Sequence, residues 1–383
     1  MNTPLNDKEL YRLSWRLAYE LIKCSYFNKC EDLEQLFNYL KSIDTTLALG
    51  IIEKCLNILQ QNKFLVTLLK PYVTLFREKK IVKVIQKYIE QDFEYMNRYW
   101  SIFSMVINAF NNNNIRYVII KHYNIPYIKM FDVDIHICEV SEILRACEEL
   151  DKLGAKFYTF RFFAHPFKLG MKFPSLDPAQ EISVEIYPEI AAGRIIVAPP
   201  CSMMSNAITI SFKNSIGSEI KVRALPDCEN LYTIITHDWY SQRISLAAII
   251  LFLARIHYCN VSKLIQLGVN YGTIHSIYTF LKILSSVEQL LGLRILNEEI
   301  HELVEELQFP GKASINNWIN NINLQQTFPI KIPYKFILLS MPYHVIKISK
   351  KIGIVKSLYD IYGHLAQPLL PYIYDMIKHV LHM

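Results

Sequence analysis

Residues 131–137 of the chain are FDVDIHI, in which apolar and polar side chains alternate. Successive side chains of a β-strand point to opposite faces of the sheet, so this alternation predicts a strand. One face is apolar and consists of Phe131, Val133, Ile135 and Ile137. The other face carries Asp132, Asp134 and His136. The sequence therefore predicts a sheet that is covered on one side and presents two carboxylates on the other.

Asp132 and Asp134 stand two residues apart on the same face of this strand. At a separation of ~4 Å and an effective dielectric constant of ~20, two carboxylates repel each other by roughly 4 kcal/mol. A divalent cation such as Mg²⁺ or Mn²⁺ removes the repulsion, because these ions prefer oxygen ligands and also bridge phosphates. The alternative is a strand whose polar face meets water, since short motifs of this kind also arise by chance.

A third carboxylate occurs in EISVEIY, residues 181–187, which alternates in the same way and places Glu185 on its polar face. If the two strands are neighbours, the three acids converge, and such a cluster is typical of metal-dependent phosphoryl transfer. Glu181 and Glu189 flank Glu185 by four residues each, so either is an alternative third acid. His136 shares the face of the first two acids, but we expect it not to bind the metal because Mg²⁺ prefers oxygen.

The pattern of apolar residues changes twice along the chain. Residues 6–111 show helical spacing, and residues 227–383 return to it with several prolines as breaks. Between them, strands are predicted at 116–120, 131–137, 156–162, 181–187, 208–213 and 218–225, and a helix at 141–154. We therefore expect an α+β fold in three domains: a helical domain (1–111), a small core with a mixed sheet of about four to six strands (112–226) and a helical C-terminal domain (227–383).

The middle of the chain resembles a known family of enzymes in four segments: YVIIKHYN (117–124), FDVDIHI (131–137), GAKFYTF (154–160) and ISVEIYPEI (182–190). They resemble the stand-alone nucleotidyltransferases of the DNA polymerase β-like superfamily, a group that includes toxin-type enzymes, over roughly residues 115–260. The resemblance implies a nucleotidyltransferase-like core between the two helical domains. It also implies transfer of a nucleoside monophosphate from a nucleoside triphosphate onto a hydroxyl of RNA (such as tRNA), of a protein or of a small molecule.

The same resemblance assigns roles to individual residues. Asp132 and Asp134 would ligate both metal ions, Mg²⁺ or Mn²⁺. Glu185 would ligate the catalytic metal and act as, or assist, the base that deprotonates the acceptor hydroxyl. Lys121 would contact the triphosphate, and His237, in a helix that follows the core, would contact a phosphate.

The chain departs from the family pattern after its first strand, where the superfamily normally has Gly-Ser or Gly-Gly close to the triphosphate. The corresponding segment here is KHYN (121–124), in which Lys121 matches a lysine of related enzymes and His122 replaces a glycine. His122 and Tyr123 are expected to narrow the space for the nucleotide. The alternative function is therefore a catalytically degenerate relative that serves as a binding or regulatory module.

Two further candidates have structural alternatives. His237 is equally consistent with a packed histidine. Asp238, the next residue, lies on an apolar helix stripe, where a carboxylate must be paired or border a cleft. An ion pair with Arg243 or Arg255 is the alternative to a role at the site. Lys129, just before the acids, is a weaker candidate for attracting phosphate.

Composition bounds the remaining possibilities. The net charge of +6 is far below the dense positive charge of a dedicated nucleic-acid-binding protein. None of the eight cysteines forms a C-x-x-C pair, so they are interpreted as packed or unpaired thiols. The N-terminus shows no apolar signal segment. Both observations favour a reducing cytoplasm as the compartment. The apolar run 244–256 is too short to span a membrane and predicts a buried helix.

The C-terminal segment 347–383 mixes lysines with tyrosines. Basic and aromatic side chains together can hold single-stranded RNA or a tRNA end by phosphate contacts and stacking. The alternative, which is the more common one for such a mixture, is a solvated helix face above an aromatic core. The acceptor of the transferred group is not fixed by the sequence.

Overall fold

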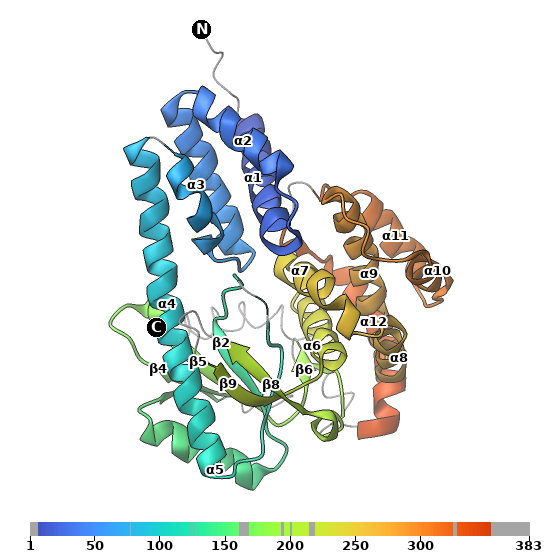
Figure 1. Cartoon of the computed structure of the whole chain (residues 1–383). Coiled ribbons are helices and arrows are strands. Elements are labelled where there is room, and N and C mark those ends of the chain that lie inside the picture. The colour runs from blue at the N-terminus through green and yellow to red at the C-terminus, as the bar shows by residue number, and fades with distance from the viewer. Residues whose placement is uncertain are drawn as a thin grey trace, which may run out of the picture.

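The computed structural model describes residues 7–76, 78–123, 125, 127–160, 168–192, 195–199, 201–213, 219–324 and 328–353. The chain forms a mixed α/β fold in which helices from both ends of the sequence surround a seven-stranded sheet (Figure 1). The sheet thus has more strands than the four to six that the sequence predicted.

The strands of the main sheet follow the order β3-β4-β5-β2-β1-β9-β8. They are β1 (Val118–Ile119), β2 (Asp132–His136), β3 (Lys156–Phe160), β4 (Leu169–Phe173), β5 (Ile182–Tyr187), β8 (Ile208–Lys213) and β9 (Glu219–Ala224). β2 pairs in parallel with β5, and β1 pairs in parallel with β9, whereas the other neighbours are antiparallel, so the sheet is mixed.

Strand β4 had no counterpart among the predicted strands. Its sequence is LGMKF, and every side chain except that of Lys172 is buried. Its apolar residues Leu169, Met171 and Phe173 share the face that packs in the core with α4 and α5. The strand has only five residues and contains a glycine, which is unfavourable in strands, so its two-residue period is a weak signal. β4 nevertheless joins β3 to β5 and so holds the edge of the sheet next to Glu185.

The apolar face of the sheet packs against two helices, α4 (Lys79–Asn112) and α5 (Val140–Lys152). The side chains of β2 and β5 that point there are fully buried: Val133, Ile135, Val184 and Ile186. Burying an aliphatic side chain contributes about 1.5–3 kcal/mol, so this layer stabilises the pair of strands that carries the acids. The polar face of the same strands is turned away from α4 and α5.

The other α-helices and the 3₁₀ helix η1 lie on the other side of the sheet, above it and to its right in Figure 1. They are α1 (Asp7–Phe27), α2 (Glu31–Ser42), α3 (Thr45–Gln61), the 3₁₀ helix η1 (Val66–Leu75), α6 (Asp227–Tyr240), α7 (Leu246–Arg255), α8 (Val261–Tyr271), α9 (Ile274–Leu290), α10 (Glu298–Glu306), α11 (Lys312–Asn320) and α12 (Tyr334–Ile352). Buried residues from both ends of the chain form one continuous core here. The N-terminal helices, including the first turns of α4 with Ile81 and Ile85, therefore share this core with the C-terminal helices.

Short strands occur outside the main sheet. β6 (Ala191–Ala192) pairs with β7 (Ile195–Ile196), and β10 (Arg243–Ile244) pairs with β11 (Ile330–Lys331). The expectation of an all-helical segment after residue 227 is wrong at β10 and β11. The predicted buried helix of 244–256 is confirmed as α7, whose residues 246–253 are all buried.

Six of the eight cysteines are paired as disulfides, so their interpretation as packed or unpaired thiols is wrong. The pairs are Cys24–Cys30, Cys138–Cys201 and Cys228–Cys259, with Cα atoms 4.6, 5.5 and 4.8 Å apart. Cys55 and Cys147 are free. Because stable disulfides are typical of oxidising surroundings, the cysteines no longer support the expected reducing compartment.

None of the described helices combines the length and the apolar composition that a membrane span requires. Three lysines of the basic and aromatic C-terminal segment, Lys347, Lys350 and Lys351, lie on α12. The rest of that segment, residues 354–383, lies outside the described residues.

Candidate metal and phosphate site

Asp132, Asp134 and Glu185 meet on the polar face of the sheet. The parallel pairing of β2 and β5 sets Asp134 opposite Glu185 and Asp132 opposite Ser183. One carboxylate oxygen of each acid lies within 4.8 Å of the others, which is close enough for one ion to bind all three. Asp134 and Glu185 are only 8% and 7% exposed, so water screens their charges poorly.

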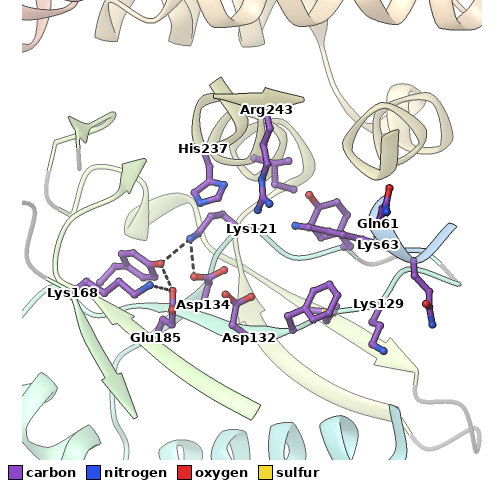
Figure 2. A pocket seen from close by; sticks show the side chains of 16 residues that line it. Gln61, Lys63, Lys121, Lys129, Asp132, Asp134, Lys168, Glu185, His237 and Arg243 are labelled. Atoms are coloured by element: carbon purple, nitrogen blue, oxygen red, sulfur yellow. Dashed lines mark hydrogen bonds and ion pairs between the residues drawn. The ribbon is translucent and has the colours of Figure 1, made fainter. Parts of the chain in front are cut away.

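The three acids line a cavity of about 460 Å³, here called the acid cavity. Among the described residues, five cationic side chains also line it: Lys63, Lys121, Lys129, Lys168 and Arg243. Figure 2 shows the acids on the wall formed by the sheet, and His237 and Arg243 on the opposite wall. The cavity therefore combines a cluster of oxygen ligands with a surplus of positive charge.

Lys121 sits between the two kinds of charge. Its Nζ lies 2.7 Å from Asp134 Oδ1 and donates a hydrogen bond to Tyr187 Oη (3.0 Å). The backbone of Lys121 is left-handed, with φ +51°, a conformation that glycine adopts freely and that costs other residues about 1–2 kcal/mol. Lys121 thus holds a backbone conformation that residues with a side chain rarely adopt.

Glu185 is held by several donors. Tyr158 Oη donates to Oε1 (3.0 Å), Tyr187 Oη donates to Oε2 (2.5 Å), and Lys168 forms an ion pair with Oε2. Burial raises the pKa of Glu185, but the ammonium groups of Lys168 and Lys121 outweigh burial and hold this pKa at about 2. Glu185 is therefore ionised at neutral pH.

Asp132 differs from the other two acids because no cation of the described residues forms an ion pair with it. Burial, together with the charges of Asp134 and Glu185, raises the pKa of Asp132 to about 7. Two of the three negative charges are thus balanced by lysines and the third is not. A bound divalent cation fits this arrangement, since it would supply the missing positive charge to three oxygen ligands.

Three polar residues close to the acids in the sequence lie outside the acid cluster: His136 and the two alternative third acids, Glu181 and Glu189. His136 is fully buried, and its Nδ1 is 2.8 Å from the carbonyl oxygen of Tyr187. Glu181 precedes β5 and pairs with Lys172 (2.8 Å), whereas Glu189 follows the strand. In the described part of the chain, none of these three side chains belongs to the acid cluster.

His122 does not narrow the cavity, contrary to expectation. Its backbone N–H donates to Asn230 Oδ1 (3.0 Å), its carbonyl oxygen accepts from Asn230 Nδ2 (2.7 Å), and its ring nitrogen Nε2 is 3.2 Å from the carbonyl oxygen of Leu225. Burial lowers the pKa of His122 to about 4, so the ring is neutral. Tyr123, the next residue, does line the cavity.

His237 lines the acid cavity, as a phosphate contact requires, and its pKa is lowered by burial and by the charge of Lys121. Asp238 is 1% exposed and accepts hydrogen bonds from the N–H and Oγ of Ser245, both at 2.9 Å. It therefore fixes the start of α7. The alternative of an ion pair with Arg243 or Arg255 is wrong for the described residues: the ion-pair contact of Asp238 is with His237, and Arg255 pairs with Asp227 (3.2 Å).

Sequence reasoning missed Lys63 and Lys168. Lys63 follows α3, and its loop is anchored to the β1–β2 loop, since Leu65 N–H donates to the carbonyl of Tyr127 (2.8 Å) and Lys129 N–H to that of Lys63 (2.6 Å). Its Nζ lies 5.1 Å from the ring centre of Tyr123. No local pattern marks a lysine that reaches a site about 70 residues further along the chain, so only the packing of the N-terminal helices reveals it.

Comparison of the chain with protein-family models, with curated proteins and with solved structures finds no match. What can be said about chemistry therefore rests on the geometry of the acid cavity. Its two features are the converging carboxylates and the five cationic side chains around them.

Proposed function

We propose that this protein is a metal-dependent nucleotidyltransferase that moves a nucleoside monophosphate from a nucleoside triphosphate onto a hydroxyl of RNA, of a protein or of a small molecule. The observation that supports it is the acid cavity itself. Three carboxylates within 4.8 Å of one another share a cavity with five cationic side chains. Such a site suits a divalent cation together with the several negative charges of a triphosphate.

The residues of the cavity suit distinct roles. Asp132, Asp134 and Glu185 would hold Mg²⁺ or Mn²⁺, which when bound would neutralise phosphate charge and orient the reacting oxygens. Lys121 and Lys63 would bind phosphate oxygens, since both ammonium groups line the cavity. The acceptor hydroxyl would attack the α-phosphorus as the bond to pyrophosphate breaks, and its proton would pass to water. Glu185, ionised and holding the metal, would assist this deprotonation, because its pKa of about 2 makes it a weak base by itself.

A second candidate is a nucleotide-binding module without catalysis. The observation that favours it is the pairing of two of the acids with lysines: Lys121 with Asp134, and Lys168 with Glu185. In this second function the lysines stay on the acids and reduce the affinity for a divalent cation. Catalysis requires instead that a triphosphate draw at least one lysine away from its acid.

Transfer of label from the four α-labelled ribonucleoside triphosphates into cellular RNA and protein tests the first candidate. We expect incorporation with Mg²⁺ or Mn²⁺, and its loss in Asp132→Asn and Asp134→Asn. Asp151→Asn is the matched control, because Asp151 is an exposed residue of α5. Thermal stabilisation by a triphosphate, about 2.7 kcal/mol at 100 times its Kd, without any incorporation would favour the second candidate.

A further inference from the structure

A second cavity, of about 700 Å³, adjoins the acid cavity. It lies between α4, η1 and the loop that joins β1 to β2, and Tyr123 and Met130 line both cavities. Small-molecule sites in proteins are commonly cavities of roughly 300–1,000 Å³ with apolar walls and a few polar groups. This space, here called the aromatic cavity, has that size and that character.

Four aromatic side chains line the aromatic cavity: Phe93, Trp100, Tyr123 and Tyr127. Phe93 is 46% exposed, so its ring is accessible to a ligand. Planar ligands stack favourably on such rings, and stacking on an aromatic side chain is worth about 1–3 kcal/mol per nucleic-acid base. The walls therefore suit a flat aromatic ligand.

Asp92 supplies a buried carboxylate to the aromatic cavity, whose lining also includes Thr67 and Lys70. It is 1% exposed, and its Oδ2 accepts a hydrogen bond from the backbone N–H of Val66. Its Oδ1 is also buried, yet no described group donates a hydrogen bond to it. Lys129 forms an ion pair with Oδ1, but its Nζ is 3.5 Å away, which is longer than a well-formed hydrogen bond. A buried acceptor of this kind leaves a strong interaction available to a ligand that brings a donor.

The two adjoining cavities suit different parts of one ligand. The acid cavity suits phosphates, whereas the aromatic cavity suits a flat ring with a hydrogen-bond donor. A nucleoside triphosphate carries both features in one molecule. We propose that the aromatic cavity binds the base of the nucleotide, with the exocyclic amino group of that base donating a hydrogen bond to Asp92 Oδ1. This inference rests on the proposed function, because it assumes that the acid cavity takes the phosphates of the same nucleotide.

The proposal predicts which nucleotides bind. Adenine, cytosine and guanine have exocyclic amino groups, whereas uracil, hypoxanthine and unsubstituted purine do not. Isothermal titration of the intact protein in excess chelator compares GTP with ITP, CTP with UTP, and ATP with purine riboside triphosphate. In at least one pair, we expect the amino-bearing nucleotide to bind about tenfold tighter or more, as for hydrogen bonds to charged groups in general.

Asp92→Asn tests the hydrogen bond directly. The asparagine must keep its oxygen on the N–H of Val66, so its NH₂ group takes the place of Oδ1 and turns an acceptor into a donor. We expect the preference for the amino-bearing nucleotide to disappear or to reverse. Phe93→Ala tests the stacking and should weaken binding of that nucleotide about tenfold. It is expected to fold, because Phe93 is half exposed. Tyr39→Ala, at an exposed aromatic residue of α2, is the control and should bind like the parent.

The outcomes separate this inference from the proposed function. If no pair of nucleotides differs, or if both Asp92→Asn and Phe93→Ala bind all nucleotides as the parent does, the base subsite is overturned. If the parent transfers label while Asp92→Asn keeps its nucleotide preference, the subsite is again overturned and the function stands. Amino-dependent binding in chelator by a protein that never transfers label supports the subsite and contradicts the function.

Discussion

Asp132 carries the one uncompensated charge of the acid cluster, and this distinguishes it from its neighbours. Asp134 is paired with Lys121, and Glu185 with Lys168. In the protein without metal, Asp132 therefore feels mainly repulsion, whereas the other two feel attraction to their lysines. The three acids, which look alike in the sequence, should respond differently to the same substitution.

Asp132→Asn should stabilise the metal-free protein by about 1–2 kcal/mol, because it removes repulsion without breaking an ion pair. Asp134→Asn should destabilise it by about 3 kcal/mol, since a buried ammonium group loses its partner. Both should abolish metal-dependent transfer. Denaturant unfolding in excess chelator measures the two stabilities. Equal stabilities for the two variants would show that Lys121 does not offset the negative charge of Asp134.

Stability should also depend on pH through Asp132. Its pKa in the folded protein is about 7, above the ordinary value of 3.8, so between these values the folded state binds more protons than the unfolded state. The unfolding free energy should therefore fall as pH rises from about 4 to about 7, by roughly 2 kcal/mol after allowance for solvent screening.

The same unfolding measurement in chelator at pH 5 and pH 7.5, on the parent and on Asp132→Asn, isolates this effect. The unfolding free energy of the variant minus that of the parent should be larger at pH 7.5 than at pH 5. The lowered pKa of Glu185, at about 2, acts with the opposite sign and in a separate range, because its contribution is lost only as pH falls below about 4.5. A difference between parent and variant that does not change with pH would contradict the raised pKa.

At the scale of elements, the loop between β1 and β2 is the shared wall of both cavities. It supplies Tyr123 and Met130 to each of them. The loop after α3 is joined to it by backbone hydrogen bonds and by the bridge between Phe64 and Ile128, which brings Lys63 to the acid cavity. The segment after α3 and the strands of the sheet thus line one cavity, although they are far apart in the sequence.

Lys63→Gln should weaken binding of inorganic tripolyphosphate about tenfold or more, because one charged hydrogen-bond donor is removed from the cavity. Burial lowers the pKa of Lys63, but Tyr123 and the carboxylates of Asp238 and Asp132 outweigh burial and raise this pKa, so the ammonium is charged at neutral pH. Calorimetric titration in chelator measures the affinity. Lys41→Gln, at an exposed lysine of α2, should bind as the parent does. Equal affinities for the two variants would show that Lys63 does not bind phosphate.

At the scale of the whole molecule, packing and disulfides join segments that the sequence keeps apart. The helices of both chain ends share one core, and α4 packs with α5 on the other face of the sheet. The Cys138–Cys201 disulfide closes a segment of 63 residues that contains β3, β4 and β5. It begins just after β2, so it ties the strand of Asp132 and Asp134 to the part of the chain that follows β5.

Cys138→Ser should lower the unfolding free energy by about 3–4 kcal/mol, because a closed loop of this length restricts the unfolded chain. Cys147→Ser is the matched control, since Cys147 is free and should cost less than about 1 kcal/mol. Denaturant unfolding without reductant compares them. The unfolded, unreduced parent should react with two equivalents of a thiol reagent, at Cys55 and Cys147. Eight reactive thiols would contradict the three disulfides.

The sequence by itself determined the strands whose two faces differ and the acids that they carry. Alternation in 131–137 and 181–187 placed Asp132, Asp134 and Glu185 on polar faces, because side-chain direction in a strand depends only on position along the chain. The N-terminal helices α1 to α4 and the buried helix α7 followed from local spacing in the same way.

Only the tertiary structure decided which segments meet. Strand β4 is short and contains a glycine, and β10 and β11 have two residues each, so none of the three produces a clear pattern. Lys63 and Lys168 reach the acids through the packing of helices and the pairing of strands, and the cysteines pair across distances in sequence that no spacing rule specifies. These contacts depend on the burial of surfaces from distant parts of the chain, and a local sequence pattern records what a segment needs to bury, not the partner that buries it.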